Sequence, residues 1–480
     1  MSDGHDSTGG AGAALNRRAF LAGSTGGISS LALGGLLTRD GLAADGVRDF
    51  APRARRVIFL TMAGGPSQLE SFDEKPELAR WDGEPMPESY TAGQPIAQLQ
   101  GFQLKCMGPR VDFRSWGESG QRISTYFPHI GGIADRIAIV RSMHTDQINH
   151  DPAHTVMNTG TSISGRPSMG SWVTYGLGHE TQDLPGFVVL VSKGGRNPQP
   201  LSTRQWHSGF LPGRYQGVQF RGGAEPVPYV DRPPGVDETG QRRVVDTAAA
   251  LNGLANEVLH DPELETRVRA YELAFRMQTS VPDLLDLSDE SEETLELYGL
   301  DPSLRTGGFQ AGSFAANALL ARRLVERGVR FVQLYHRGWD HHNDIDKFMG
   351  ICSGLTDQGS AALVQDLERR GLLEDTLVVW TGEFGRTPMV QTNKGGPGRD
   401  HHMRAFSLWM AGGGIRGGVT HGETDELGYH VGRDPVHVND LHATMLHLLG
   451  MNHEGLTWRY RGRDFRLTDV AGEVIRPILA

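Results

Sequence analysis

The sequence predicts an α/β protein whose doubly wound, mostly parallel sheet is flanked by helices. Short runs of β-branched and aromatic residues, such as 376–380, stop abruptly at polar residues and are too short for helices. Helical patterns precede two of these runs, as 355–373 precedes 376–380. The 64 glycines among 480 residues exceed average usage, and many end an apolar run. That distribution favours many tight turns between strands and helices.

The elements expected along the chain alternate in type. We expect buried strands at 56–62, 136–140, 187–191, 329–335, 376–380 and 406–410. We expect helices at 151–158, 242–280, 314–325, 355–373 and 438–449. The first of these helices should be capped by Asp151, carry Pro152 in its first turn and end before Gly160. The second places Val244, Ala248, Leu251, Leu254 and Val258 at helical spacing.

The chain length and composition bound the domain organisation. An apolar content of 38% and a charged content of 22% are typical of a folded globular protein. We expect a signal peptide at 1–44 and a single domain at 45–480. Two long loop excursions are expected within that domain, at about 74–127 and 198–234, because both stretches are rich in turn-forming residues.

The first 44 residues have the order of an export signal. Arg17 and Arg18 precede Phe20, a weakly apolar run and a small-residue cleavage site at 41–44. This order resembles a twin-arginine signal, so we expect export of the folded chain to the periplasm or the extracellular space. The alternative is a flexible tail whose arginines are incidental. Glycines and serines interrupt the run too often for a membrane span, and the mature sequence offers no transmembrane segment.

Charge and cysteine content exclude some functions. The net charge of -10 argues against a nucleic-acid partner. Cys106 and Cys352 are the only cysteines, and neither has zinc-ligand spacing. They could pair in an oxidising compartment, and the sequence leaves that open. A metal ion would therefore depend on histidines and carboxylates.

Two neighbouring strand ends carry groups that bind metals. Asp340 and His342 follow the strand 329–335, and Glu383 follows the strand 376–380. Open α/β sheets bind ligands beyond the carboxyl ends of their strands, so these side chains could converge. An Asp-x-His spacing can place an oxygen and a nitrogen on one cation. The alternative is a surface turn that caps the next helix, and Asp344 in the same loop is a further carboxylate.

Glu383 needs a partner for its charge if it ends a buried strand. A cation or an arginine is the usual partner of a buried carboxylate. Arg386 could pair with Glu383 without any metal, or it could bind an anionic substrate group through two parallel hydrogen bonds. The sequence leaves both alternatives open.

Further histidines lie in two clusters. Asp400, His401 and His402 follow a glycine-rich loop, where one imidazole could bind a metal while the carboxylate fixes its tautomer. The alternative is a solvent-exposed histidine pair. His150 stands at the start of an expected helix, whose dipole favours an anion such as sulfate or phosphate. Structural packing is the alternative for His144 and His154.

These motifs together resemble a known family. The chain is similar to family fifteen-oh-one of the domains of unknown function, a sulfatase-like family related to the alkaline phosphatase and sulfatase superfamily. The motifs that carry the resemblance span the mature chain and are Gly64-Gly65-Pro66-Ser67, Gly338 to His342, Thr381 to Pro388, Gly398 to His402, Ala411 to Ile415, Asp440 to Thr444 and Gly462 to Phe465. The resemblance implies an alkaline phosphatase-like fold, with one or two divalent cations beside a nucleophile at a helix N-terminus.

The resemblance also implies roles for individual residues. By position, Asp340, His342, Glu383 and His401 are similar to metal ligands, and His150 aligns with the nucleophile. No Cys or Ser stands there to mature to formylglycine. Gln68 and Glu70 occupy positions where relatives often carry His and Asp. The alternative or supporting ligands are Asp400, His402, Asp344, Glu70, Asp73 and His154.

The function expected from the sequence is hydrolysis of sulfate or phosphate esters by an exported metal-dependent enzyme, with sulfated glycans as one substrate class. His150 would be nucleophile or general acid and base, and Arg386 would steady the anion. Mixed nitrogen and oxygen ligands favour zinc or manganese, with calcium and magnesium as alternatives. Two other functions stay open: a non-catalytic metal-binding envelope protein, and a hydrolase of uncharged carbohydrate that uses two acids about 5 to 9 Å apart.

Overall fold

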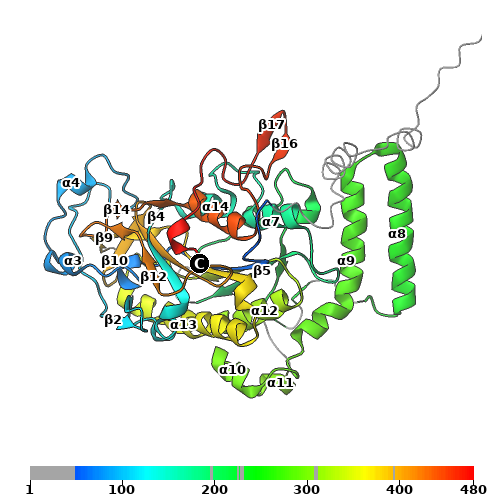
Figure 1. The fold of residues 1–480 in the computed structure, drawn as a ribbon, viewed down its shortest axis with the longest axis horizontal. Helices are drawn as coiled ribbons and strands as arrows, with labels where there is room; N and C mark the ends of the chain where they lie inside the picture. Colours follow the sequence, from blue (N-terminus) through cyan, green and yellow to red (C-terminus); the bar gives the residue numbers. More distant parts are fainter. Residues whose placement is uncertain (1–48, 195–197, 224–225, 228–231, 308–311, 393–394) are drawn as a thin grey trace, which may run out of the picture. The chain divides into compact units, whose positions relative to one another are not determined.

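A central sheet organises the protein, for which a computed structural model describes residues 49–194, 198–223, 226–227, 232–307, 312–392 and 395–480. All of these described residues belong to one compact unit (Figure 1). The expected signal peptide, 1–44, lies outside the described residues. None of the described helices combines the length and apolar character that a bilayer crossing requires.

The sheet is mostly parallel, as predicted. Its strand order is β12-β4-β11-β8-β1-β7-β5-β6, with β15 paired to β4. All of its pairings are parallel except those of β11, which runs antiparallel to both β8 and β4. The strands are β1 (Arg56–Ala63), β4 (Ile137–His144), β5 (Phe187–Lys193), β6 (Val218–Phe220), β7 (Phe331–Arg337), β8 (Thr376–Thr381), β11 (Phe406–Ala411), β12 (Val419–His421) and β15 (Val436–His437).

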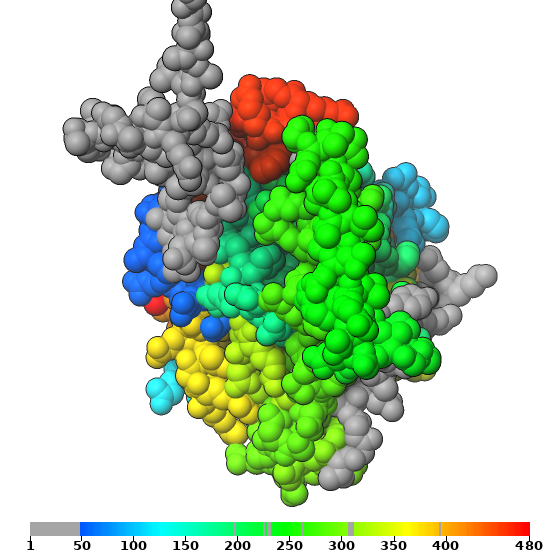
Figure 2. Space-filling model, turned by 90° about the vertical axis from the view of Figure 1, so that its right-hand side faces the viewer, coloured from blue at the N-terminus to red at the C-terminus, as the bar shows by residue number. Residues whose placement is uncertain are grey.

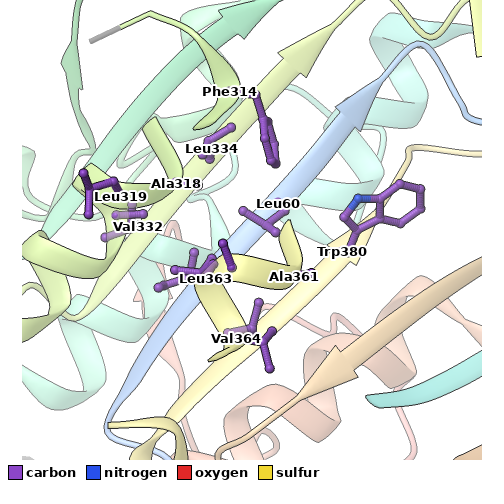
Figure 3. Packing of buried hydrophobic residues seen from close by; sticks show 14 of the residues in the cluster. Leu60, Phe314, Ala318, Leu319, Val332, Leu334, Ala361, Leu363, Val364 and Trp380 are labelled. Carbon is purple, nitrogen blue, oxygen red and sulfur yellow. The ribbon is translucent and has the colours of Figure 1, made fainter. Parts of the chain in front are cut away.

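Helices cover both faces of this sheet because its strands are apolar on both sides. In β1, Ile58 and Leu60 belong to one buried cluster, whereas Val57 and Phe59 belong to the other. Figure 3 shows Leu60 and Trp380 of the sheet in the first cluster, which the helices α12 (Phe314–Glu326) and α13 (Ile345–Arg369) complete. The second cluster is completed by α6 (His150–Thr159), α7 (Met169–Leu177) and α14 (Val438–Leu448).

Smaller elements surround this core. Within the described residues, four two-stranded hairpins stand apart from the main sheet: β2 (Phe113–Trp116) with β3 (Gln121–Ser124), β9 (Gly385–Gln391) with β10 (Gly398–His402), β13 (Glu423–Thr424) with β14 (Val431–Arg433), and β16 (Trp458–Tyr460) with β17 (Arg463–Phe465). The other α-helices of the described part of the chain are α3 (Pro76–Arg80), α4 (Glu88–Thr91), α5 (Pro128–Gly131), α8 (Glu238–Leu259), α9 (Pro262–Leu285), α10 (Glu292–Tyr298) and α11 (Leu304–Gly307). The segment 198–234, which was expected to be a loop excursion, also contains the edge strand β6.

The long helix expected at 242–280 is two helices. The chain breaks at His260, which has a left-handed φ of 51°. Asp261 then caps α9, because its side chain accepts a hydrogen bond from the Glu263 amide, and Pro262 occupies the first helical position. Asp followed by Pro is a helix start signal, and it outweighs the continuous helical pattern on either side.

Two helix starts also differ from expectation. The N-cap of α6 is Asn149, and α6 begins at His150. Asp151 is therefore inside the first turn and is not the cap. Helix α13 begins at Ile345 rather than at 355, which brings its start directly after the strand-end loop of β7. Cys106 and Cys352 are both buried and free, so no disulfide joins them.

Candidate metal centre

Four side chains converge beyond the carboxyl ends of the central strands. His150, Asp340, His342 and His401 each offer one ligand atom, and these atoms lie within 4.8 Å of one another. Asp340 and His342 follow β7, His150 begins α6, and His401 lies on β10. Three of the four ligands expected from the sequence are thus brought together, and His150 joins them in place of Glu383.

Two glycines let the backbone bring these residues close. Gly64, directly after β1, has a φ of +123°, and a Cβ there would lie 2.5 Å from the Asp340 amide nitrogen. A Cβ at Gly398 would lie 2.2 Å from the carbonyl carbon of His342. Only glycine allows such close approach of two backbones. The hairpin strand that carries His401 therefore lies directly against the loop that carries His342.

The hydrogen bonds of the three imidazoles fix their tautomers. The Nδ1 atoms of His150, His342 and His401 contact Glu383 Oε1 at 2.7 Å, Gln391 Oε1 at 2.6 Å and the Ile148 carbonyl at 3.0 Å. A carboxylate or carbonyl oxygen only accepts, so each Nδ1 donates its proton. Each Nε2 then presents a lone pair to the centre.

Those lone pairs face one another at short range. The Nε2 atoms of His342 and His401 are 2.9 Å apart. The Nε2 of His150 is buried and makes no hydrogen bond within the described part of the chain, and it lies 3.3 Å from Asp340 Oδ1. Converging lone pairs beside a carboxylate oxygen are the donor set that a divalent cation requires. The four residues fit a metal ion.

Asp340 is held as a carboxylate. Its Oδ1 accepts from Arg386 at 2.7 Å, and its Oδ2 accepts from the Gln199 amide at 2.6 Å. Burial alone would raise the pKa of Asp340, but the charge of the Arg386 guanidinium outweighs burial and holds this pKa well below its usual range. The oxygen that faces the histidines is therefore charged at neutral pH.

Arg386 is enclosed by protein acceptors. Its side chain is fully buried and donates to the carbonyls of Gly64, Gly65 and Arg399 as well as to Asp340. It pairs with Asp340 and not with Glu383. The sequence analysis gave Arg386 two roles, a partner of Glu383 or a substrate-anion clamp, and the geometry supports neither. Arg386 instead fixes the position of Asp340.

Glu383 is not one of the four converging side chains, but a hydrogen bond joins it to one of them, His150. Both of its oxygens accept from the Gly64 amide, at 3.0 and 3.1 Å, and Oε1 also accepts from His150. Burial raises the pKa of this carboxyl, but the imidazoles of His154 and His150 outweigh burial and bring it to about 2. Glu383 is thus a charged acceptor that orients His150, the arrangement common behind metal-binding histidines.

The pKa values of the histidines in and behind the centre shift in different directions. Burial opposes protonation of His150, but the neighbouring carboxylates of Asp340 and Glu383 outweigh burial and raise its pKa. Burial lowers the pKa of His401 to about 4. Burial also lowers the pKa of His154, which is fully buried with Nε2 3.4 Å from Glu383 Oε1. His154 is packed behind the centre and is not among the converging ligands.

The neighbours of His401 and Asp340 in sequence point elsewhere. Asp400 accepts from the backbone amides of residues 98 and 99 and from its neighbour's amide. His402 donates to the Tyr429 carbonyl at 2.5 Å. Asp344, in a left-handed conformation, accepts from the Gly396 amide at 2.7 Å. These three residues shape the loops around the centre without joining it.

The carboxylates of the first strand's loop are paired with cations. Glu70 is fully buried against Arg399, with a shortest contact of 2.7 Å. Asp73 contacts Lys75 at 3.0 Å and accepts from the Thr424 hydroxyl. Neither residue joins the centre. His144 packs against His437, with ring centroids 5.1 Å apart.

Three glutamines form hydrogen bonds around the centre, and none of them was expected from the sequence. Gln391 accepts from His342 and donates to Gln98 Oε1 at a distance of 3.0 Å, and Gln199 donates to Asp340. The Gln98 and Gln199 side chains come from the two long excursions. No local pattern marks a neutral amide as part of such a centre, so only the folded arrangement reveals them.

Fold and centre together define an α/β protein with a candidate metal site of three histidines and one aspartate. The sequence matches a family profile over residues 54–479, and the chain therefore belongs to the DUF1501 family, which is described as a protein of unknown function. This membership confirms the family resemblance of the sequence motifs. No curated protein gives a significant match to the sequence.

Solved structures of the expected superfamily are similar at a distance. A sulfatase from Pseudoalteromonas sp. is 14% identical, covers 89% of this chain and 73% of its own, and has a TM-score of 0.33. The alkaline phosphatase of the Antarctic bacterium TAB5 is 10% identical, with coverages of 84% and 99% and a TM-score of 0.34. A phosphonate monoester hydrolase from Silicibacter pomeroyi is 11% identical, with coverages of 88% and 76% and a TM-score of 0.32. At these scores the likenesses say nothing about this chain's chemistry, which must come from its own geometry.

Proposed function

We propose that the protein is an exported, metal-dependent hydrolase of sulfate or phosphate esters in which water, and not a side chain, attacks the ester. One observation carries the proposal: the Nε2 atoms of three imidazoles and an oxygen of Asp340 converge, while every Nδ1 donates to an acceptor. Both nitrogens of His150 are thus engaged. That leaves neither available as the nucleophile expected from the sequence.

His150, Asp340, His342 and His401 would hold the cation. When bound, a divalent cation supplies a Lewis acid that polarises an ester oxygen and lowers the pKa of water. Four protein ligands fill a tetrahedral zinc site, whereas manganese accepts more ligands and leaves positions for substrate. We therefore favour manganese for the active enzyme. Gln199 and Arg386 hold Asp340 in place, and Glu383 holds His150.

The start of α6 supports an anionic substrate. The helix begins at His150, inside the centre, and its first backbone amides have no acceptor within the helix. The positive end of the helix dipole stabilises sulfate or phosphate oxygens. Arg204 pairs with Asp151 at this same helix end, and its side chain remains 37% exposed. We propose that Arg204 takes the anion-binding role that the sequence analysis gave to Arg386.

Turnover tests the hydrolase directly. The purified mature chain, loaded with manganese or with zinc, is assayed with a chromogenic aryl sulfate and an aryl phosphate. We expect turnover of at least one ester by the manganese form, its loss in His401→Asn and its retention in His402→Asn. The two histidines are adjacent and both buried, but only His401 faces the centre. Failure of the metal-loaded wild-type protein to turn over any ester contradicts the proposal.

A non-catalytic metal-binding protein is the second candidate, and the four protein ligands favour it. A zinc ion with four protein ligands has no open position, which is characteristic of structural sites. Tight, stoichiometric zinc binding without turnover in either metal form would support this candidate over the hydrolase.

Export through the twin-arginine route is part of the proposal. The arginine pair, the weak apolar run and the small residues at 41–44 support it. Replacement of Arg17 and Arg18 by lysine should trap the precursor in the cytoplasm, as measured by fractionation and immunoblotting. An unchanged distribution of the mature chain would contradict this route.

A further inference from the structure

The outer face of α8 carries an apolar stripe at coiled-coil spacing. We define the α8 seam as Val244, Thr247, Leu251, Leu254 and Val258, whose intervals alternate between three and four residues. All five are exposed, with exposed fractions of 60% for Val244, 62% for Leu251 and Leu254, and 79% for Val258. Figure 2 views the protein with α8 and α9, in green, toward the reader.

Within the described residues, few side chains of α8 are buried against other elements. Of its 22 residues only Val245 is buried. It lies against α9, where Arg242 contacts Glu272 at 2.8 Å. Gly253, in the helix interior, would have no atom within 4 Å of an added Cβ and lowers helix propensity by about 1 kcal/mol. Helices of this kind are stable mainly through packing of an apolar face. The helix therefore needs a partner on its seam.

We propose that the α8 seam pairs with the α8 seam of a second copy of this chain, in antiparallel orientation. The charges that flank the seam favour this arrangement. Arg243 lies at one end and Glu257 at the other, and both are exposed. An antiparallel pair with a two-fold axis near Ala250 brings Arg243 of each copy beside Glu257 of the other. A parallel pair would instead place Arg243 beside Ala248 of the other copy and would form neither ion pair.

The residues beside the seam allow close approach. Ala248, Ala250 and Ala255 occupy the positions that flank the seam between the two charged ends. Small side chains there let two helices pack without obstruction. From Val244 to Val258 the seam is about 21 Å long, at 1.5 Å per residue. Such an interface is small, so we expect a reversible dimer rather than an obligate one. The inference is independent of the metal centre.

Sedimentation velocity of the full mature chain over a range of concentrations tests the dimer. The wild-type protein should show a monomer–dimer equilibrium. Leu251→Asp should weaken it at least ten-fold, since it places a carboxylate in the seam. Arg243→Glu alone should weaken dimerisation, and Arg243→Glu combined with Glu257→Arg should restore it. Arg267→Glu, at an exposed position of α9 outside the seam, is the matched charge-reversal control.

Each outcome of these measurements either supports the antiparallel dimer or overturns it. Restoration by the double charge reversal supports an antiparallel seam, because only that geometry re-forms both ion pairs. A wild-type chain that stays monomeric up to about 100 µM overturns the proposal, whatever else covers α8. A dimer that Leu251→Asp leaves unchanged also overturns it, because the interface then lies elsewhere. Circular dichroism checks that each exposed-site variant remains folded.

Discussion

Oε1 of Glu383 accepts a hydrogen bond of 2.7 Å from Nδ1 of His150, although the two residues lie 233 positions apart in sequence. The bond is fully enclosed on the Glu383 side, where the Gly64 amide contacts both carboxylate oxygens. Because it fixes the proton on Nδ1, it turns the Nε2 lone pair toward Asp340, His342 and His401. The chemistry proposed for the centre depends on this orientation.

Loss of the Glu383 charge should weaken metal binding. In Glu383→Gln the side chain can still accept from His150, but its amide group would meet the Gly64 amide donor and the negative charge is gone. We expect metal affinity, measured by chelator competition, to fall about 10- to 100-fold. Asp344→Asn, which removes a carboxylate outside the centre, should leave affinity unchanged. Equal affinities in the two variants would argue against the role of Glu383.

Arg386 should matter for stability. Its guanidinium is fully buried and satisfies several backbone carbonyls together with Asp340. Arg386→Gln leaves those acceptors and a buried carboxylate without their partner, so we expect a loss of about 3 to 5 kcal/mol in the free energy of unfolding. Urea titration measures it. A variant of wild-type stability with a raised KM would instead indicate direct contact with substrate.

Arg204, unlike Arg386, should matter for substrate binding and not for stability. Its side chain is partly exposed beside the start of α6. Arg204→Gln should raise KM for a charged ester about ten-fold, the loss of one hydrogen bond to an anion, while metal content and unfolding free energy stay near wild type. Steady-state kinetics with a sulfate or phosphate ester provides the measurement. A lowered kcat with unchanged KM would be incompatible with a simple anion-binding role.

Gly64 should tolerate no side chain. Gly64→Ala combines an unfavourable φ of +123° with a Cβ 2.5 Å from the Asp340 amide. Displacement of Asp340 should abolish metal binding as well as destabilise the chain. Gly83→Ala is the control, because Gly83 also has a positive φ, +83°, but has no atom within 4 Å of an added Cβ. It should lose only about 1 to 2 kcal/mol through backbone strain and keep its metal.

Buried neutral histidines should make the fold sensitive to acid. Burial lowers the pKa values of His336 and His442 from 6.5 to about 4. Below pH 6.5 the unfolded chain binds protons that the folded chain refuses, so stability falls as the pH drops from 6.5 toward 4 and is unaffected above that range. Each group should cost about 2 kcal/mol at pH 5.

His336→Asn tests this account. The drop in unfolding free energy between pH 7 and pH 5, from urea titrations, should shrink by about 2 kcal/mol relative to wild type. The exposed His260→Asn should leave the drop unchanged. An identical pH dependence in wild type and His336→Asn would refute the assignment of His336 as a buried neutral group.

The main sheet was predictable because composition alone marks buried parallel strands. The expected strand at 376–380 is β8, Thr376–Thr381, and that at 56–62 is β1, Arg56–Ala63. Alternating helices then required a parallel arrangement with helices on both faces. The β9–β10 hairpin was missed because Pro388 interrupts the first strand and glycines dominate the loop. The break between α8 and α9 was missed although Asp261 and Pro262 signal it.

The centre was only partly predictable. The rule that ligands gather at strand ends placed Asp340 and His342, and the family resemblance added His401, which follows a glycine-rich loop. The sequence could not tell that Glu383 would reach His150 rather than the ligand atoms, or that Asp340 would take Arg386. Those outcomes depend on which ring nitrogen or carboxylate oxygen faces the centre. Such differences of a few ångströms arise from tertiary packing, which local sequence patterns do not record.

Metal content of the purified mature chain tests the central claim most directly. We expect about one equivalent of zinc or manganese in the wild-type protein, retained in His402→Asn and lost in His401→Asn, by elemental analysis after dialysis. The two variants remove adjacent buried imidazoles that differ only in whether they face Asp340. Wild-type protein that binds no divalent cation, or His401→Asn that keeps a full equivalent, would contradict the account.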